Sequence, residues 1–200
     1  ESNYTTLGKA EEDYTMGLNN TIRYKRLSFG FNFDFRHGGL MYSATKATLY
    51  FTGNAEETMY NLRDPWIYPN SVVQVGKDGA GNPVYAENDR PINSFYNVHG
   101  LYNDANNYAV YRDFLIEKTY VKLRELNISY TLPDKWFENV RWLSSINVSL
   151  VGRNLLMWTP NQGLVDPDNT NYGNDLTSQY GEFFSAPSTR TFGGSVKIVF

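Results

Sequence analysis

The sequence contains no cysteine among its 200 residues. Without thiols, the chain can form neither a disulfide framework nor a thiolate metal site. It also lacks any apolar run of about 18 residues, the length that a membrane-spanning helix requires. The absence of such a run excludes a helical membrane protein. It leaves a transmembrane β-barrel open, because half of each barrel strand faces a polar interior and mean hydropathy, here −0.50, stays low.

The net charge is small and histidines are few. The formal net charge is −3 and the isoelectric point is near 5.4, so no nucleic-acid partner is expected. His37 and His99 are the only histidines, and neither has a second ligand type at metal spacing. No cofactor is therefore predicted. The chain begins at Glu1 without a charged and apolar leader, and we expect it to be a piece of a longer protein whose export signal lies upstream or has been removed.

Aromatic residues, by contrast, are abundant, with 16 Tyr, 12 Phe and 4 Trp. Residues 27–35 read Leu-Ser-Phe-Gly-Phe-Asn-Phe-Asp-Phe, so apolar residues alternate with small or polar ones. On a strand, alternate side chains point to opposite faces. Leu27 and the phenylalanines then share one face, while Asn32, Asp34 and Arg36 share the other.

The length of this alternation indicates what its aromatic face contacts. Ten residues at about 3.3 Å each, tilted by roughly 45°, project to about 23 Å, close to the apolar band of about 25 Å in a transmembrane barrel. Strands of soluble proteins are usually only about five or six residues long. Comparable patterns predict strands near residues 14–24, 27–36, 120–131, 145–158 and 191–200.

The connections between these strands differ strongly in length. Lys25-Arg26 is a tight turn and 133–144 a short link, whereas 37–119 and 159–190 are long. Outer-membrane barrels have short periplasmic turns and long extracellular loops. We therefore predict an all-β fold, a segment of about five antiparallel strands of a large transmembrane barrel with both long loops external. A soluble β-sandwich remains the alternative, because sandwiches sometimes place long loops at one end.

Two local features are expected inside the first long loop. Residues 44–50 are able to form a short helix. The glycine cluster 76–83 indicates a hairpin tip, since it lacks the residue order of a phosphate-binding loop.

Six short motifs follow one another along nearly the whole chain. They are Leu49-Tyr50-Phe51-Thr52-Gly53-Asn54, Tyr120-Val121-Lys122-Leu123-Arg124-Glu125-Leu126, Ser129-Tyr130-Thr131-Leu132-Pro133, Ser149-Leu150-Val151-Gly152-Arg153-Asn154-Leu155, Asp166-Pro167-Asp168 and Pro187-Ser188-Thr189-Arg190-Thr191-Phe192-Gly193. In content and order they resemble the late barrel of the SusC/RagA family of TonB-dependent transporters.

This resemblance implies that residues 1–200 are the C-terminal part of a plugged barrel of about 22 strands, without its plug domain. The whole protein would import a nutrient, a glycan or peptide oligomer, across the cell outer membrane of a Gram-negative, Bacteroidetes-type bacterium. The TonB complex would supply the energy through the absent N-terminal plug region, and a SusD-like surface lipoprotein would form a lid. Outer-membrane lipid would surround the wall. No enzymatic activity is implied.

The long loops supply the candidates for ligand or lid contact, because aromatic faces stack on sugars and anchor protein interfaces. These candidates are Tyr60, Trp66, Tyr68, Tyr85, Tyr96 and Tyr102. The alternative is that they pack the loop upon itself. The lumen-facing wall is predicted to include Asn32, Asp34, Arg36, Glu125 and Arg153. On this face, Arg36, Glu125 and either Arg124 or Arg153 would be able to form ion pairs with the plug.

Residues 166–171 begin like a calcium loop, with Asp166 and Asp168 at alternate positions. The EF-hand template then requires glycine and glutamate where this chain has Asn171 and Thr177, so a turn-rich external loop is favoured. No nucleophile elbow or paired carboxylates point to catalysis, which leaves a barrel-embedded hydrolase without support. The remaining functional alternative is a secreted carbohydrate-binding β-sandwich module without catalysis.

Overall fold

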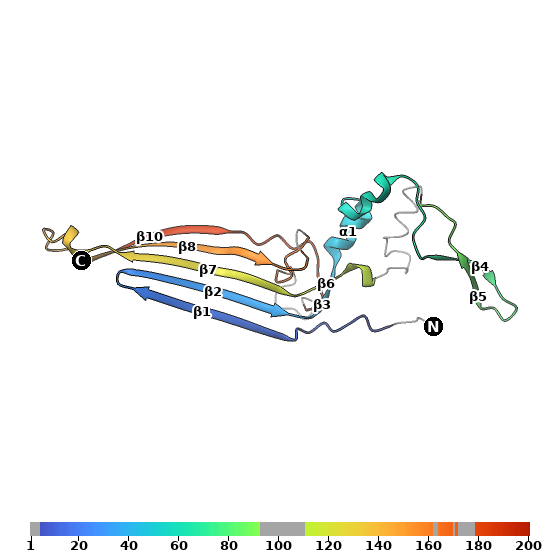
Figure 1. The fold of residues 1–200 in the computed structure, drawn as a ribbon, viewed down its shortest axis with the longest axis horizontal. Helices are drawn as coiled ribbons and strands as arrows, with labels where there is room; N and C mark the ends of the chain where they lie inside the picture. Colours follow the sequence, from blue (N-terminus) through green and yellow to red (C-terminus); the bar gives the residue numbers. More distant parts are fainter. Residues whose placement is uncertain (1–4, 93–110, 162–163, 170, 172–178) are drawn as a thin grey trace. The chain divides into compact units, whose positions relative to one another are not determined.

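The computed structural model describes residues 5–92, 111–161, 164–169, 171 and 179–200. Its main element is a sheet of five antiparallel strands in the order β1-β2-β7-β8-β10 (Figure 1). These strands are β1 (Tyr14–Tyr24), β2 (Leu27–His37), β7 (Tyr120–Thr131), β8 (Ser145–Trp158) and β10 (Thr191–Val199). The predicted all-β fold, with about five antiparallel strands, is confirmed.

The chain divides into two units, Glu1–Thr45 with Leu115–Phe200, and Lys46–Phe114. Besides the large sheet, the first unit contains a small sheet in the order β6-β3-β9. Its strands are β3 (Leu40–Ser43), β6 (Leu115–Glu117) and β9 (Gly181–Glu182), and a 3-10 turn, η4 (Asp134–Trp136), follows β7.

The second unit contains the remaining elements. The helix α1 (Ala44–Thr52) begins at the boundary, and η1 (Glu56–Arg63), β4 (Val72–Lys77), β5 (Pro83–Glu87) and η3 (Tyr111–Phe114) follow. Strands β4 and β5 pair antiparallel, so the glycine cluster does form a hairpin tip. Among the described residues, no helix has the length and apolar character needed to cross a membrane.

The register gives the large sheet two chemically different faces. Phe31 pairs with Leu126, and the next residue, Asn32, pairs with Glu125. The phenylalanines of β2 form a row, with successive ring centroids 5.8, 5.8 and 6.0 Å apart. This apolar face is open to its surroundings, since Phe192 is 78% exposed. An extended, exposed apolar face is typical of a wall in lipid.

The sandwich alternative does not fit this arrangement. A sandwich buries one face of each sheet against a second sheet about 10 Å away. The other two sheets formed by the described residues have only three and two strands. The described residues therefore form no second sheet of comparable size that would match the row of phenylalanines.

Strand β7 has one extra residue, Arg124, relative to β2, and at the same place β8 has one extra residue relative to β7. The register shifts between Asn32 and Phe33 on one side and between Leu123 and Glu125 on the other. Strict alternation would place Arg124 on the apolar face together with Leu126. A β-bulge redirects side chains locally, and here Arg124 binds Asp34 on the polar face.

The most deeply buried side chains lie next to one end of the long strands, while most of the two sheet faces is exposed or half-buried. All residues of β1 and β10 are exposed. The largest fully buried side chains are Met41, Ser43, Thr159, Pro167 and Glu182. They belong to β3, β9 and the segment after β8, so this external-loop candidate folds back against the chain.

The turn Gly38-Gly39 permits a close approach of the N-terminal segment. Both glycines have positive φ, 77° and 81°. A Cβ atom at Gly39 would lie 3.0 Å from the Ala10 carbonyl oxygen. Only glycine combines this backbone conformation with so little space, and the approach brings Glu12 close to the end of β2.

Candidate functional site

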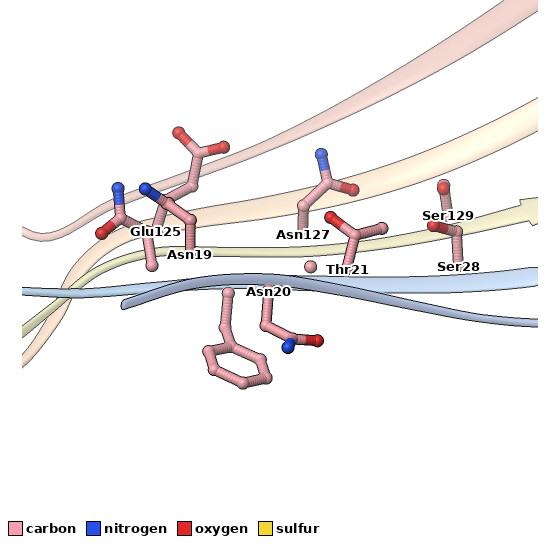
Figure 2. Close-up of a pocket in the computed structure, with 10 residues that line it drawn as sticks. Asn19, Asn20, Thr21, Ser28, Glu125, Asn127 and Ser129 are labelled. Carbon is pink, nitrogen blue, oxygen red and sulfur yellow. The ribbon is translucent and has the colours of Figure 1, made fainter. Parts of the chain in front are cut away.

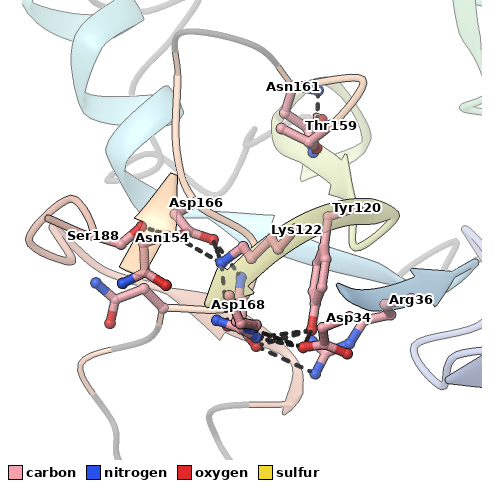
Figure 3. Close-up of polar contacts among 12 residues, drawn as sticks. Asp34, Arg36, Tyr120, Lys122, Asn154, Thr159, Asn161, Asp166, Asp168 and Ser188 are labelled. Carbon is pink, nitrogen blue, oxygen red and sulfur yellow. Dashed lines mark hydrogen bonds and ion pairs between the residues drawn. The ribbon is translucent and has the colours of Figure 1, made fainter. Parts of the chain in front are cut away.

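A cluster of charged side chains lies on the polar face of β2 and β7, close to the folded-back loop (Figure 3). We call it the charge cluster. It consists of three cations and three carboxylates, namely Arg36, Lys122 and Arg124 with Asp34, Asp166 and Asp168. The formal charges cancel, so each ion depends on its neighbours for compensation.

Lys122 and Asp166 form the most deeply buried pair of the charge cluster. The Lys122 Nζ lies 2.6 and 2.8 Å from the two carboxylate oxygens of Asp166, and each side chain is only 4% exposed. Lys122 also donates to Asp168 at 3.1 Å. Because both charges have left water, either one alone would be strongly destabilising.

Arg124 connects strand β2 with the loop. Its Nη2 lies 2.6 Å from Asp34 and 2.6 Å from Asp168, and its Nε lies 3.0 Å from Asp34. The bulge is what makes this bridge possible, since it turns Arg124 to the polar side of the sheet. Charge-assisted hydrogen bonds of this length are among the strong ones in proteins.

Tyr120 completes the cluster. Its hydroxyl lies 3.1 Å from Asp34 and 3.2 Å from Asp168, so its single proton is donated to one carboxylate at a time (Figure 3). The Arg36 guanidinium lies over the ring, 5.1 Å from its centroid. This contact fixes the position of Arg36 by a cation–π interaction.

The turn Asp166-Pro167-Asp168 is held by its own hydrogen bonds as well as by the wall. The Asp168 amide donates to Asp166 Oδ1 at 3.0 Å, and the Ser188 hydroxyl donates to Asp166 Oδ2. The two arms of the loop therefore meet at one carboxylate. The carboxylates of the weak calcium candidate face lysine and arginine, and the described residues include no group of three His, Cys, Asp or Glu able to hold a metal ion.

Asp168 illustrates how the charges balance. Burial disfavours its ionised form, but the positive charges of Lys122 and Arg124 favour that form more strongly. The pKa of Asp168 therefore lies below its ordinary value. Glu12 behaves alike, since burial is outweighed by its own backbone hydrogen bond and by Lys118 and Arg36, and its pKa is lowered too. Both carboxylates are therefore ionised at neutral pH.

The predicted wall residues divide into two groups. Asp34 and Arg36 belong to the charge cluster. Glu125 and Arg153 do not, and instead pair with each other at 3.1 Å in an exposed position on the same face. All of these ion pairs form within this chain, and additional ion pairs with a plug stay a prediction. That this face borders a lumen stays a prediction.

Sequence reasoning missed several members of the cluster. It did not assign Lys122 or Tyr120 to the site, and it considered Asp166 and Asp168 only as calcium ligands. The available signal was Tyr120-Val121-Lys122, which places an aromatic and a cation on one face of a strand. The bulge at Arg124 also left a signal, because the apolar residues shift from odd positions, Val121 and Leu123, to even positions from Leu126 onward.

A polar groove of about 410 Å³ lies farther along the same sheet (Figure 2). Its lining is mostly polar and includes Asn19, Thr21, Ser28, Asn32, Glu125, Asn127 and Ser129. Asn20 also belongs to the lining, but its side chain points to the opposite side of the sheet (Figure 2). Ser28, Ser129, Ser149 and Ser195 pair across four neighbouring strands and form a serine row. Small hydroxyl groups let another polar surface approach the wall closely.

The loop aromatics are only partly brought together. The rings of Trp66 and Tyr68 lie 5.5 Å apart, whereas Tyr85 lies on the β4–β5 hairpin and is 57% exposed. For Tyr60 only the backbone, within η1, is described, and Tyr96 and Tyr102 lie outside the described residues. Contact with a ligand or lid stays a prediction for all six.

No family model matches the chain. The sequence is similar to TonB-dependent receptor P26 of Formosa agariphila, with 25% identity over 198 residues, 97% of this chain and 18% of that protein. TonB-dependent receptor P3 of the same organism is 28% identical over 191 residues, 93% of this chain and 16% of that protein.

The fold is similar to solved structures of the RagAB peptide importer. The "closed-closed" state gives a TM-score of 0.57 at 17% identity and covers 94% of this chain and 17% of that chain. The "open-open" state gives 0.54 at 19% identity, covering 93% of this chain and 17% of that chain. The chain thus spans less than a fifth of each protein to which it is similar.

Proposed function

We propose that this chain, which has the barrel fold of the SusC/RagA-type TonB-dependent transporters and is related to TonB-dependent receptors, forms part of the wall of an outer-membrane nutrient importer. The observation that carries the proposal is the two-faced sheet. One face bears the row of phenylalanines, and the other bears the charge cluster and the serine row. Strand β2, with 11 residues, is long enough to cross an apolar band of about 25 Å when tilted.

In this proposal the long loops 37–119 and 159–190 are external and the short connections are periplasmic. The two short connections are tied together, because Arg26 donates to the Leu132 carbonyl at 2.6 Å and pairs with Asp134 at 3.1 Å. The wall must close with further strands, because an unpaired strand edge in lipid leaves backbone groups without partners. The plug and the TonB-pairing segment belong to the rest of the protein.

Energy for import would come from the TonB complex, and a SusD-like surface lipoprotein would cap the outer opening. The names of the relatives support the first point, and the RagAB neighbours support the second. The imported nutrient would be a peptide or glycan oligomer, and the peptide importer among the neighbours favours a peptide. Trp66, Tyr68 and Tyr85 are the described aromatics proposed to contact ligand or lid. The role is one of transport and not catalysis.

The experiment that tests this function uses the full-length gene. Its deletion is expected to abolish uptake of a labelled oligopeptide or oligosaccharide, and the intact gene is expected to restore it. A matched variant that lacks the TonB-pairing segment is expected to reach the outer membrane but not to restore uptake. Unchanged uptake after deletion, or full activity without that segment, would contradict the proposal.

A further inference from the structure

Arg36 lines a cavity of about 590 Å³ next to the charge cluster. The N-terminal segment supplies Glu11 and Glu12, the end of β6 leads into Lys118, and the loop supplies Gln179 and Tyr180. The cavity is thus built from segments far apart in the sequence. Its cationic lining residues are Arg36 and Lys118.

The guanidinium of Arg36 has hydrogen-bond donors without acceptors. Its Nε is buried and has no partner, and its terminal nitrogens lie 3.6 Å from Glu12 and 3.6 Å from Asp168. These distances allow electrostatic attraction but not hydrogen bonds of ordinary geometry. In the part of the chain that the structure describes, Arg36 therefore has a charge that is balanced and donors that are unused.

The neighbouring carboxylates are already engaged. Asp168 accepts from Lys122 and Arg124. Glu12 is shared between Arg36 and Lys118, whose Nζ lies 3.4 Å away and whose side chain is only 4% exposed. Neither acid can move fully onto Arg36 without leaving another cation less well compensated.

Arg36 is also held in one orientation. Its guanidinium lies against the Tyr120 ring, and its side chain is 23% exposed. A planar guanidinium matches the geometry of a carboxylate, and a fixed one loses little freedom on binding. The arrangement suits a single additional carboxylate.

We propose that this cavity binds a carboxylate group of the imported ligand through Arg36, with Lys118 as a second cation. The proposal rests on the proposed transport function and specifies its ligand chemistry. The carboxylate would be the C-terminus of a peptide or the uronic acid of an oligosaccharide. Because Glu11, Glu12 and Asp168 also line the cavity, groups with several adjacent negative charges are disfavoured.

The test measures binding to the full-length transporter, purified in detergent with its partner lipoprotein. The four probes are a neutral tetrapeptide with a free C-terminus, its C-terminal amide, a tri-uronate oligosaccharide and its methyl ester. We expect one acid to bind about tenfold or more tightly than its neutral counterpart, as charged hydrogen bonds allow. The pair that differs identifies the source of the carboxylate.

Arg36→Gln is expected to abolish this difference, and Arg36→Lys, which keeps the charge without the fork, to retain part of it. Arg153→Gln, on the same face but outside the cavity, serves as the matched control and is expected to retain it fully. Heat-dependent mobility of the barrel on a gel verifies folding. If Arg36→Gln fails to fold, Lys118→Gln is expected to weaken binding of the acid alone.

Equal affinities within both pairs, binding of none of the probes, or a folded Arg36→Gln variant that still discriminates would overturn the carboxylate site. Uptake is measured separately. Import without discrimination would overturn the site and leave the transport function intact. Arg36-dependent discrimination without import would do the reverse.

Discussion

Lys122 and Asp166 lie 44 residues apart in the sequence and form an ion pair with both side chains 4% exposed. The pair joins strand β7 of the wall to the loop that follows β8. It is supported by Arg124, which bridges Asp34 and Asp168. The position of this loop therefore depends on a few charged contacts, each of which is open to mutation.

Lys122→Met is expected to destabilise the folded loop, because it leaves the Asp166 charge buried without its partner. Removing one member of a buried pair typically costs about 3–5 kcal/mol. The measurement is the denaturant midpoint of the full-length protein, combined with proteolysis of residues 164–169. The control is Lys197→Met, which replaces an exposed lysine on the polar face of β10 and should change stability little. Equal effects of both substitutions would contradict the buried pair.

Acid is expected to release the same loop. The folded pKa of Asp168 is lowered, so its contribution to stability is complete above the ordinary aspartate pKa of about 3.9 and is lost as the pH falls through the lower folded pKa. Hydrogen exchange of residues 164–169 between neutral pH and about pH 3 measures the release. Asp168→Asn should lower protection at neutral pH and flatten its acid dependence. An unchanged profile in this variant would show that other groups control the loop.

The two faces of β2 are expected to respond differently to the same charge. Phe31→Arg places a cation on the apolar face near mid-strand and should cost about 2–4 kcal/mol in a lipid-facing wall. Asn32→Arg places it one residue later on the polar face, opposite Glu125, and should be tolerated. The amount of heat-stable barrel in outer membranes reports both. Similar losses at the two positions would argue against the assigned orientation.

The bulge at Arg124 is expected to serve the loop and not barrel assembly. Deleting Arg124 removes the extra residue, but the residues on either side of it keep their partners in β2, so Tyr120 and Lys122 stay on the polar face. The full-length barrel should therefore still assemble, while the loop is loosened because the bridge from Asp34 to Asp168 is lost. Arg124→Gln keeps the bulge and removes only the charge, so it should loosen the loop as well. The amount of heat-stable barrel and proteolysis of residues 164–169 measure the two effects, and failure of the deletion alone to assemble would show that the wall itself needs the bulge.

Local patterns were enough to identify the wall strands. The alternation around Phe31 and Asn32 separates the two faces without knowledge of any other part of the chain, because side chains of a strand alternate with a period of two. The hairpin at residues 76–83 was also predicted from a local pattern, since its glycines permit the turn. The fold class followed from repeating such patterns.

The charge cluster was harder to predict from the sequence than the strands. Asp34 and Arg36 were assigned to the polar face, but Asp34 pairs with Arg124 of β7, and Arg36 pairs with Asp168 in a loop more than 130 residues later in the sequence. Asp166 and Asp168 resembled a calcium loop when considered alone, because acidic residues at alternate positions have the same local appearance whether they face a metal ion or cations of the wall.

The sequence by itself determined the strands, their apolar and polar faces and the length suited to an apolar band, because these depend on the alternation of neighbouring residues. Only the tertiary structure decided that Arg124 turns to the polar face and that the 159–190 loop folds back onto Lys122. The first depends on the register of three strands at once. The second depends on charges that become close only when the loop is folded, where burial makes their pairing necessary.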